Sequence, residues 1–441
     1  MKKKVISVLL AATMIGGLLA GCGSGSGSDS KTEDGKTKIR FLSAMELVDE
    51  DMIEAFEKEN PDIEVDFDYV DSGNYSAKFA ALASSNEVPD VFWTQAGYYC
   101  DQINEGLLLD ISEYLDGDNY EGDATWRDTY VPALLENLQS MVQSGCGEMD
   151  SYDYGVPFTM TTVAVMYDKA MYEKLGLSVP ETWDAFMANC EALKEAGYTP
   201  LSVQSNTCID WLPRLFWDQF CRDEIEEEGK SFENGEMTFQ SKSVQKGLET
   251  YKEIWDKGYL PENFMTSDLD TTAQLFLQGE LAQVLIAPDK LEYIMDNAPD
   301  TMELGTYVLP GIDGLPSRTL GGASNIFAVS ADTENPDAAV KLVQYLTSKT
   351  NFTTDEGLKY SSSGLVNVER DPALDEILAG YNAAAENGFC PETFVPVTVS
   401  TEIKTAFQED LIPNYLLGQV SLEDMTTELQ DIYNTYLEDK E

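Results

Sequence analysis

The fold class follows from residues 38–93, which read KIRFLSAMELVDEDMIEAFEKENPDIEVDFDYVDSGNYSAKFAALASSNEVPDVFW. Strand-favouring residues predict strands at 38–42, 63–69 and 89–93, the second with apolar side chains alternating with acids as in a half-buried strand. Apolar side chains at helical spacing predict a helix in each of the two gaps, the first stopped by Asn60-Pro61. This order of strands and helices is that of βαβ units, which build a parallel sheet. The chain is therefore predicted to be an α/β protein.

The rest of the chain continues the alternation of strands and helices. Further strands are predicted at 162–167, 201–203 and 281–287, and further helices at 182–196 with Thr182 as N-cap, at 271–278 and from Pro336 onward. No repeat period is visible, and no apolar span of 18 or more residues follows the N-terminal one. Beyond residue 37 about 400 residues remain, which is enough for two domains.

The N-terminal segment predicts export and lipid anchoring. Three lysines at 2–4 precede an apolar run from 5 to 20, which is the pattern of a secretory signal and is short for a membrane span. The sequence LAGC at 19–22 resembles the bacterial lipobox, in which the cysteine is diacylated and becomes the new N-terminus. We therefore expect a signal peptide at 1–21, then lipidated Cys22 and a flexible Gly/Ser tether at 22–37. The mature protein would be lipid-anchored on the extracytoplasmic face of the cell membrane; an ordinary signal peptide with a chance cysteine is the alternative.

Composition excludes several classes of function. The chain has 79 acidic and 28 basic residues and a net charge of −51, so it repels nucleic acid and anionic lipid headgroups. It has no histidine, which excludes Ser-His-Asp and Cys-His catalysis and removes the commonest zinc ligand. The acids show no calcium-loop spacing, and neither a metal nor a cofactor is predicted. The six cysteines after Cys22 show no CxxC pair, so both disulfides and buried thiols stay open.

Several short strings occur in a characteristic order along the chain. They lie at 63–69, 88–91 (VPDV), 106–111 (GLLLDI), 154–157 (YGVP), 166–169 (MYDK), 175–177 (LGL), 180–186 (PETWDAF), 278–282 (QGELA), 321–322 (GG) and 326–329 (IFAV). In this order, over nearly the whole mature chain, they resemble the family 1 extracellular solute-binding proteins, the maltose-binding-like receptors of ABC importers. Most of the matching residues have scaffold roles, so the resemblance supports the fold better than the ligand.

The resemblance implies a two-lobed periplasmic-binding-protein-like fold of type II. Each lobe is expected to be a mainly parallel sheet flanked by helices, and a hinge links the two. The chain would cross near 157–161, near 309–310 and soon after residue 348. Lobe one would combine 38–158 with 310–350, and lobe two 159–309 with 351–441. Ligand would bind in the cleft between lobes of a monomer that closes about its hinge.

Candidate ligand contacts follow from the chemistry of sugars, which present flat apolar faces and rims of hydroxyl groups. A receptor needs aromatic rings and hydrogen-bonding side chains, at the carboxyl ends of strands where open α/β sheets bind ligands. The candidates are Glu46, Trp93, Thr94, Gln95, Tyr98, Thr161, Asn206, Asp210, Trp211, Asp289, Ser324 and Ser363, with Met45, Asn325 and the turn at 361–364 beside them. The alternatives are a core role for Trp93 and, for Asp210, a helix cap with Trp211 packed beneath it.

The resemblance implies a receptor and not an enzyme. It would capture a mono- or oligosaccharide and deliver it to the membrane permease of an ABC importer. The loop at 287–289 (APD) lacks the tryptophan that some sugar receptors place there, so the pocket is not a copy of a maltodextrin site. Two other functions stay open. One is a surface-anchored glycoside hydrolase that uses two of the many carboxylates; the other is the same receptor fold with a polyamine or peptide ligand.

Overall fold

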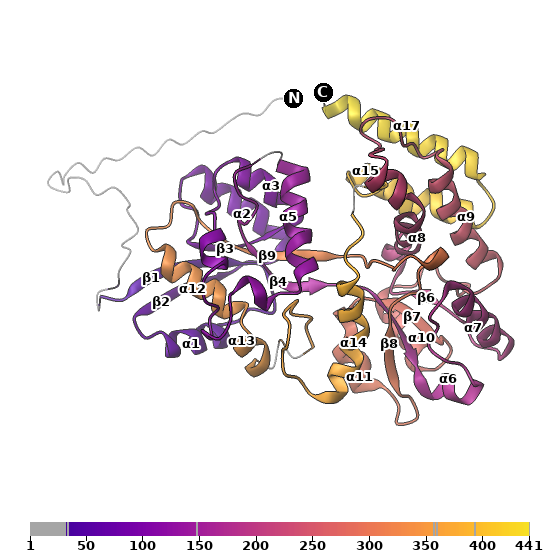
Figure 1. Cartoon of the computed structure of the whole chain (residues 1–441), viewed down its shortest axis with the longest axis horizontal. Helices are drawn as coiled ribbons and strands as arrows, with labels where there is room; N and C mark the ends of the chain where they lie inside the picture. Colours follow the sequence, from indigo (N-terminus) through magenta and orange to yellow (C-terminus); the bar gives the residue numbers. More distant parts are fainter. Residues whose placement is uncertain are drawn as a thin grey trace, which may run out of the picture.

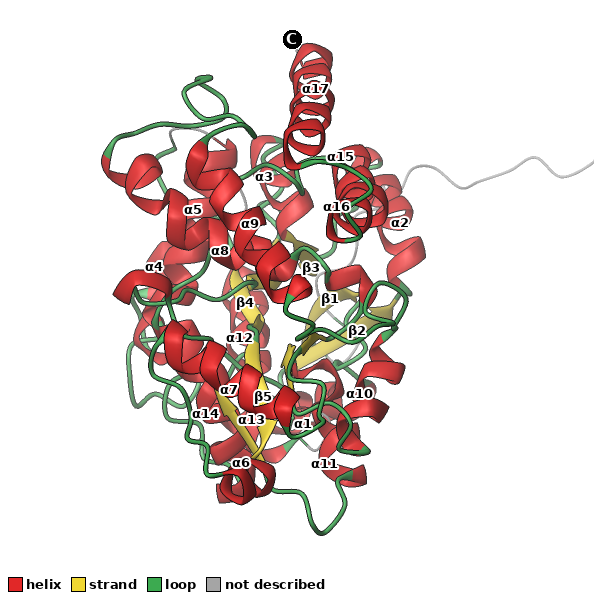
Figure 2. Ribbon diagram, turned by 90° about the vertical axis from the view of Figure 1, so that its right-hand side faces the viewer, coloured by secondary structure: helices red, strands yellow, loops and turns green. Residues whose placement is uncertain are grey.

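The computed structural model describes residues 32, 35–146, 149–355, 358, 360–391 and 394–440. The predicted signal peptide and Cys22 lie outside these residues. Figure 1 shows two α/β lobes side by side along the long axis of the molecule, and Figure 2 looks along that axis onto strands enclosed by helices. Among the residues that the structure describes, none of the helices has the length and apolar character needed to cross a membrane.

The first lobe is built on a five-stranded sheet in the order β2-β1-β3-β9-β4. Its strands are β1 (Thr37–Ser43), β2 (Ile63–Tyr69), β3 (Val91–Gln95), β4 (Val156–Thr161) and β9 (Gly322–Val329). Its helices include α1 (Glu50–Glu59), α2 (Ser72–Ser84), α3 (Ala96–Asn104), α5 (Pro132–Cys146), α12 (Pro336–Leu346) and α13 (Lys349–Thr354). Strand β1 runs parallel to both β2 and β3. The βαβαβ unit predicted from residues 38–93 is thus confirmed.

The second lobe is built on a four-stranded sheet in the order β6-β7-β5-β8. Its strands are β5 (Ala164–Asp168), β6 (Ser202–Val203), β7 (Gln283–Ile286) and β8 (Leu304–Tyr307). Its helices include α6 (Lys169–Leu175), α7 (Trp183–Glu195), α8 (Trp211–Arg222), α9 (Lys242–Asp256), α10 (Leu269–Leu277), α11 (Leu291–Asn297), α14 (Pro372–Glu386) and α17 (Leu422–Lys440). The hydroxyl of Thr182 accepts a hydrogen bond from the Ala185 amide at 3.2 Å, which confirms the N-cap of α7.

Both sheets are mixed, whereas the sequence predicts mainly parallel ones. Strand β9 runs antiparallel to β3 and β4, and β5 runs antiparallel to β7 and β8. The antiparallel pairings arise at strands that adjoin the crossings between the lobes, such as β4, β5, β8 and β9. A strand that enters a sheet from the other lobe is not bound by the parallel direction that a helix crossover imposes within one βαβ unit.

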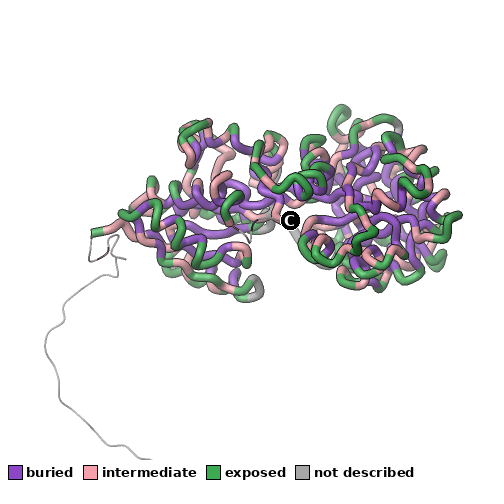
Figure 3. The backbone as a smooth tube through the Cα atoms, turned by 90° about the horizontal axis from the view of Figure 1, so that it is seen from below, coloured by how far each residue is buried: buried purple, intermediate pink, exposed green. Residues whose placement is uncertain are grey.

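Each lobe has its own hydrophobic core, and Figure 3 shows a buried interior in both halves of the tube with exposed turns around it. Phe352, Leu358 and Leu365 pack into the core of the first lobe, whereas Leu374 and Ile377 pack against the second sheet. We therefore propose that the third crossing lies just before α14 and not directly after residue 348. The other predicted lobe boundaries stay predictions.

Thr319 joins two segments that pass between the lobes to the segment that follows α14. Its hydroxyl accepts from the amide of Val163 at 2.9 Å and donates to the carbonyl of the same residue at 3.0 Å. Its own amide donates to the Gly388 carbonyl at 3.0 Å, and its carbonyl accepts from the Cys390 amide at 2.8 Å. Thr319 is 2% exposed, so these bonds form in a dry environment. We call Val163, Thr319, Gly388 and Cys390 the hinge clasp.

A buried carboxylate fixes the crossing segment 312–318 to α8. Asp218 is 1% exposed; its Oδ1 accepts from Nε of Arg318 at 2.8 Å, and its Oδ2 pairs with Arg222. Arg222 also donates to the Pro316 carbonyl at 3.0 Å, and the neighbouring Gln219 accepts from the Ile312 amide at 3.1 Å. The crossing segment is therefore anchored to the second lobe by one end of a single helix.

The cysteines, which the sequence leaves undecided, divide into two groups. Cys100 and Cys146 form a disulfide that joins α3 to α5 on the first lobe. Cys190, Cys208, Cys221 and Cys390 are not disulfide-bonded and are buried in the second lobe. Burial raises the pKa of the thiols of Cys190, Cys221 and Cys390. Both kinds of cysteine that the composition allows are therefore present.

Candidate ligand-binding site in the cleft

A cavity of about 300 Å³ lies where the two lobes face each other. Its volume is at the lower end of the range of small-molecule sites. It is lined from the first lobe by Met45, Leu47, Thr159, Met160, Thr161 and Asn325, from the second by Pro288 and Glu292, and by Tyr360, Ser361 and Ser362 of the segment before the third crossing. A molecule held here touches both lobes at once.

The cavity lies at the carboxyl ends of strands from both sheets. Met45 follows the end of β1 at Ser43, and Pro288 follows the end of β7 at Ile286. Strand β4 adds its last residue, Thr161. This is the edge of an α/β sheet at which ligands bind, in the crevice outside the carboxyl ends of the strands.

The described lining is rich in neutral polar groups. Thr159, Thr161, Ser361 and Ser362 supply hydroxyls, and these can each donate and accept a hydrogen bond. Asn325 adds an amide and Tyr360 a phenol ring. Glu292 is the one carboxylate among the lining residues described, which include no lysine or arginine. The cavity therefore suits an uncharged ligand that carries many hydroxyl groups.

Asn325 is held at the cavity wall by two side chains. Its Oδ1 accepts from the indole Nε1 of Trp93 at 3.1 Å, and its Nδ2 donates to Oγ1 of Thr159 at 3.4 Å. Trp93 itself is 4% exposed, and the ring of Tyr75 meets it edge-on with centroids 4.9 Å apart. The indole of Trp93 is thus a core side chain. Its Nε1 contacts a residue of the cavity wall, but its ring faces are covered by protein and are not available for stacking on a ligand.

The other candidates of the first lobe lie at different depths. Thr161 lines the cavity, and Glu46 is exposed next to the lining residue Met45. Thr94 is 1% exposed and donates to Gln102 at 2.6 Å, so it points into the core. Gln95 is exposed at the end of β3, and Tyr98 is 45% exposed on α3.

The candidates around the start of α8 do not line the cavity. Asp210 is 2% exposed; its carboxylate accepts from Gln408 at 2.7 Å and lies 3.6 Å from Arg214. Burial raises the pKa of Asp210, against the opposing effect of Arg214 and Gln408. Trp211 packs against the core of the second lobe, and Asn206 is half-buried in a short 3-10 turn. Asp210 precedes the helix but makes no capping bond with its side chain.

Three candidates have neighbours in the cavity wall. The side chains of Asp289 and Ser324 lie outside the described part of the structure, but Pro288 and Asn325 beside them line the cavity. Ser363 is 4% exposed, and its hydroxyl accepts from the Leu365 amide at 3.1 Å, which fixes the turn. The two serines before it, 361 and 362, face the cavity instead.

Sequence reasoning missed Leu47, Thr159, Met160, Glu292 and Tyr360 as lining residues. Thr159 lies two residues before the candidate Thr161 on β4, although the pairing of β4 with β9 shifts register between them. Glu292 follows Asp289 by three residues and is the second residue of α11. These spacings could have suggested Thr159 and Glu292. They identify lining residues only once it is known which parts of the two lobes face each other.

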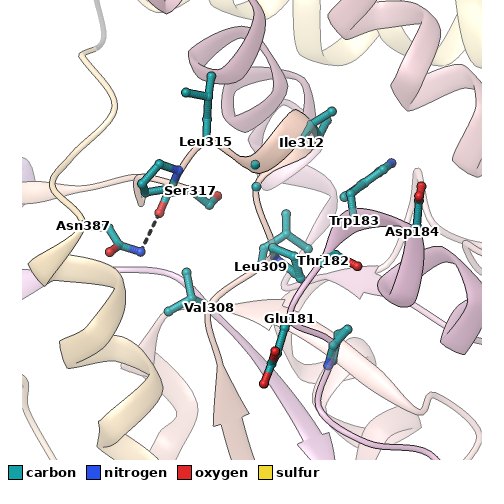
Figure 4. Close-up of a pocket in the computed structure, with 15 residues that line it drawn as sticks. Glu181, Thr182, Trp183, Asp184, Val308, Leu309, Ile312, Leu315, Ser317 and Asn387 are labelled. Carbon is teal, nitrogen blue, oxygen red and sulfur yellow. Dashed lines mark hydrogen bonds between the residues drawn. The ribbon is translucent and has the colours of Figure 1, made fainter.

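A second cavity, of about 590 Å³, lies beside the crossing segment and is drawn in Figure 4. Its wall is formed by 180–184 at the start of α7, by 308–317 without Asp313, and by Asn387, whose Nδ2 donates to the Ser317 carbonyl at 3.1 Å. None of its described lining residues comes from the first sheet. A ligand here would not bridge the lobes, so the smaller cavity is the better candidate for a site that responds to lobe closure.

Comparison with known proteins agrees with this geometry. The multiple sugar-binding protein of Streptococcus mutans is 23% identical over 365 residues, which are 78% of each chain. The melibiose/raffinose/stachyose-binding protein MelE of Bacillus subtilis is 22% identical over 377 residues, which are 80% of each chain. The solved structure of the sugar-binding protein MalE from Xanthomonas citri is 18% identical, with a TM-score of 0.71 over 92% of this chain and 100% of the other.

The fold of that structure confirms the predicted two-lobed α/β architecture. The model of a sequence family, described as bacterial extracellular solute-binding protein, matches residues 37–351. Members of this family are binding proteins that act outside the cytoplasm, which confirms the prediction of a receptor and not an enzyme. The chain belongs to the family of bacterial extracellular solute-binding proteins.

Proposed function

We propose that this protein is a monomeric, lipid-anchored receptor that captures a carbohydrate in the cleft and delivers it to the permease of an ABC importer. The observation that carries the proposal is the cavity whose wall combines hydroxyl and amide groups from both lobes. The names of the relatives from Streptococcus mutans and Bacillus subtilis, both of which bind sugars, support the same ligand class.

The proposed mechanism is reversible closure about the hinge clasp. A ligand that touches both lobes stabilises the closed form, because it adds contacts that the open form lacks. The clasp and the Asp218 anchor hold the crossing segments while the lobes rotate. A dissociation constant near 1 μM corresponds to about −8 kcal/mol, which several hydrogen bonds and apolar contacts supply.

The side chains that line the cavity favour a sugar receptor over a glycoside hydrolase and over a polyamine receptor. A glycoside hydrolase places two carboxyl groups across the scissile bond, about 5–10 Å apart. A polyamine site needs several carboxylates to pair with its amines. Glu292 is the one acid in the described lining, so both rivals lack their second group there.

A thermal-shift screen tests the ligand class. The mature chain without its anchor is heated with neutral sugars, including raffinose and maltotriose, and in parallel with spermidine, a short peptide and metal salts. A sugar at 100 times its dissociation constant is expected to stabilise the native state by about 2.7 kcal/mol and raise the melting temperature. Asn325→Asp, which replaces a donor in the cavity wall with a carboxylate, is the matched control and should abolish the shift. Stabilisation by spermidine alone, or release of shorter sugars, would contradict the proposal.

Lipid anchoring is tested separately with Cys22→Ser. Without the thiol there is no diacylation, so the protein is expected to move from the membrane fraction into the medium. Its affinity for the sugar should stay unchanged, because Cys22 lies 15 residues before the start of β1 at Thr37. Release of the wild type as well as the variant into the medium would mean that an ordinary signal peptide directs export, and retention of the variant in the membrane fraction would contradict anchoring through Cys22.

A further inference from the structure

We propose that Trp93 is a positioning residue that turns the amide group of Asn325 so that its NH₂ group and the hydroxyl of Thr159 both donate hydrogen bonds into the cleft. The cleft wall would then recognise a ligand oxygen that accepts hydrogen bonds, such as a ring or hydroxyl oxygen of a sugar. The proposal rests on the function proposed above and names which ligand atom this part of the wall takes.

The orientation of the Asn325 amide follows from the chemistry of the indole. The Nε1–H group of tryptophan can only donate, so the atom of Asn325 that lies 3.1 Å from it must be the carbonyl oxygen. The NH₂ group is consequently directed away from Trp93. A phenylalanine or leucine at position 93 would leave both orientations of the amide open.

Thr159 adds a second hydrogen-bond donor to the same part of the cavity wall. One hydrogen of the Asn325 NH₂ group is directed at Thr159 Oγ1 at 3.4 Å. A hydroxyl that accepts in this way can still donate its own hydrogen, and within the described residues the second amide hydrogen has no other acceptor. Because both residues line the cavity, the wall offers two donors side by side.

Trp93 is itself held in place, as a positioning residue must be. It pairs in register with Phe327 on β9, and Asn325 lies two residues further along, on the same face of the sheet. An aromatic side chain reaches such a diagonal neighbour. Tyr75 packs edge-on against the indole, and its hydroxyl donates to the Trp93 carbonyl. The indole therefore has little freedom to leave Asn325.

The orientation can be tested without any ligand. In ¹H–¹⁵N spectra of the mature chain, Asn325→Ala is expected to shift the indole N–H signal of Trp93 and to speed its exchange with solvent, because the indole loses its acceptor. Ser361→Ala, in the same cavity wall, leaves both partners of the Trp93–Asn325 bond in place; it is the control and should leave the signal unchanged. An unchanged Trp93 signal in Asn325→Ala would overturn the proposal.

The effect on recognition is tested with raffinose by calorimetry. Trp93→Phe keeps an apolar ring but removes the donor, and we expect about tenfold weaker binding. If Trp93 acts through Asn325, then Trp93→Phe in the Asn325→Ala background should cost little more, so the two effects are not additive. Full additivity would overturn the positioning role. Failure of the wild-type chain to bind any sugar would overturn the proposed function, while the spectra still decide the orientation of the amide.

Discussion

Replacing Cys100 and Cys146 with serine is expected to lower the free energy of unfolding by about 4 kcal/mol. The disulfide joins residues 46 apart in sequence, and a loop of that length restricts the unfolded chain strongly in the chain-entropy model. It also links α3 to α5, two helices that pack on one another over the first sheet. Urea denaturation of the double variant and the wild type measures the difference.

Reduction of the wild type provides the matched control for this prediction. Cys100 and Cys146 are half-buried, whereas Cys190, Cys208, Cys221 and Cys390 are buried and not disulfide-bonded. Dithiothreitol should therefore lower the melting temperature of the wild type toward that of the serine variant and leave the variant unchanged. Equal melting temperatures of the reduced and oxidised wild type would refute the disulfide.

Replacing Asp218 with alanine is expected to cost about 3–5 kcal/mol of folding free energy, because removal of one partner leaves buried charges uncompensated. The side chains of Arg222 and Arg318 are only 15% and 16% exposed. Without Asp218, Arg318 keeps its contact with Glu226 at 2.8 Å, but within the described part of the chain Arg222 retains only its hydrogen bond to the Pro316 carbonyl. The crossing segment would then lose its main attachment to α8.

A triple variant distinguishes lost charge compensation from lost packing. Asp218→Leu with Arg222→Met and Arg318→Met removes all three charges together and should recover most of the stability lost in Asp218→Ala. Asp218→Asn keeps the shape but offers a single carbonyl oxygen to two guanidinium groups, so its cost should lie between these two variants. If Asp218→Ala melted within 1 °C of the wild type, the anchor would be unimportant.

The sequence predicts those parts of the site that depend on the local order of strands and helices. Loops at the carboxyl ends of strands were predicted from the order of elements, and Thr161 of the candidates lines the cavity, with residues next to Glu46, Asp289, Ser324 and Ser363. It could not predict which residue of each loop faces the cleft, because that depends on turn geometry such as the Ser363–Leu365 bond. The prediction that Asp210 and Trp211 lie in a loop at the cleft was wrong, because they begin α8 and pack in the second lobe.

The sequence by itself determined the α/β class, the βαβαβ start and local features such as the Thr182 cap, because periodicity and capping act within a few residues. Only the tertiary structure decided the direction of β9, the Cys100–Cys146 pair and the contact between Trp93 and Asn325, which lie 232 residues apart. Such pairings depend on how whole sheets and helices pack, and no local spacing encodes them. The sequence suggests Trp93 as a ring on which a sugar could stack. In the folded chain its indole is instead buried behind the cleft wall and donates a hydrogen bond to Asn325.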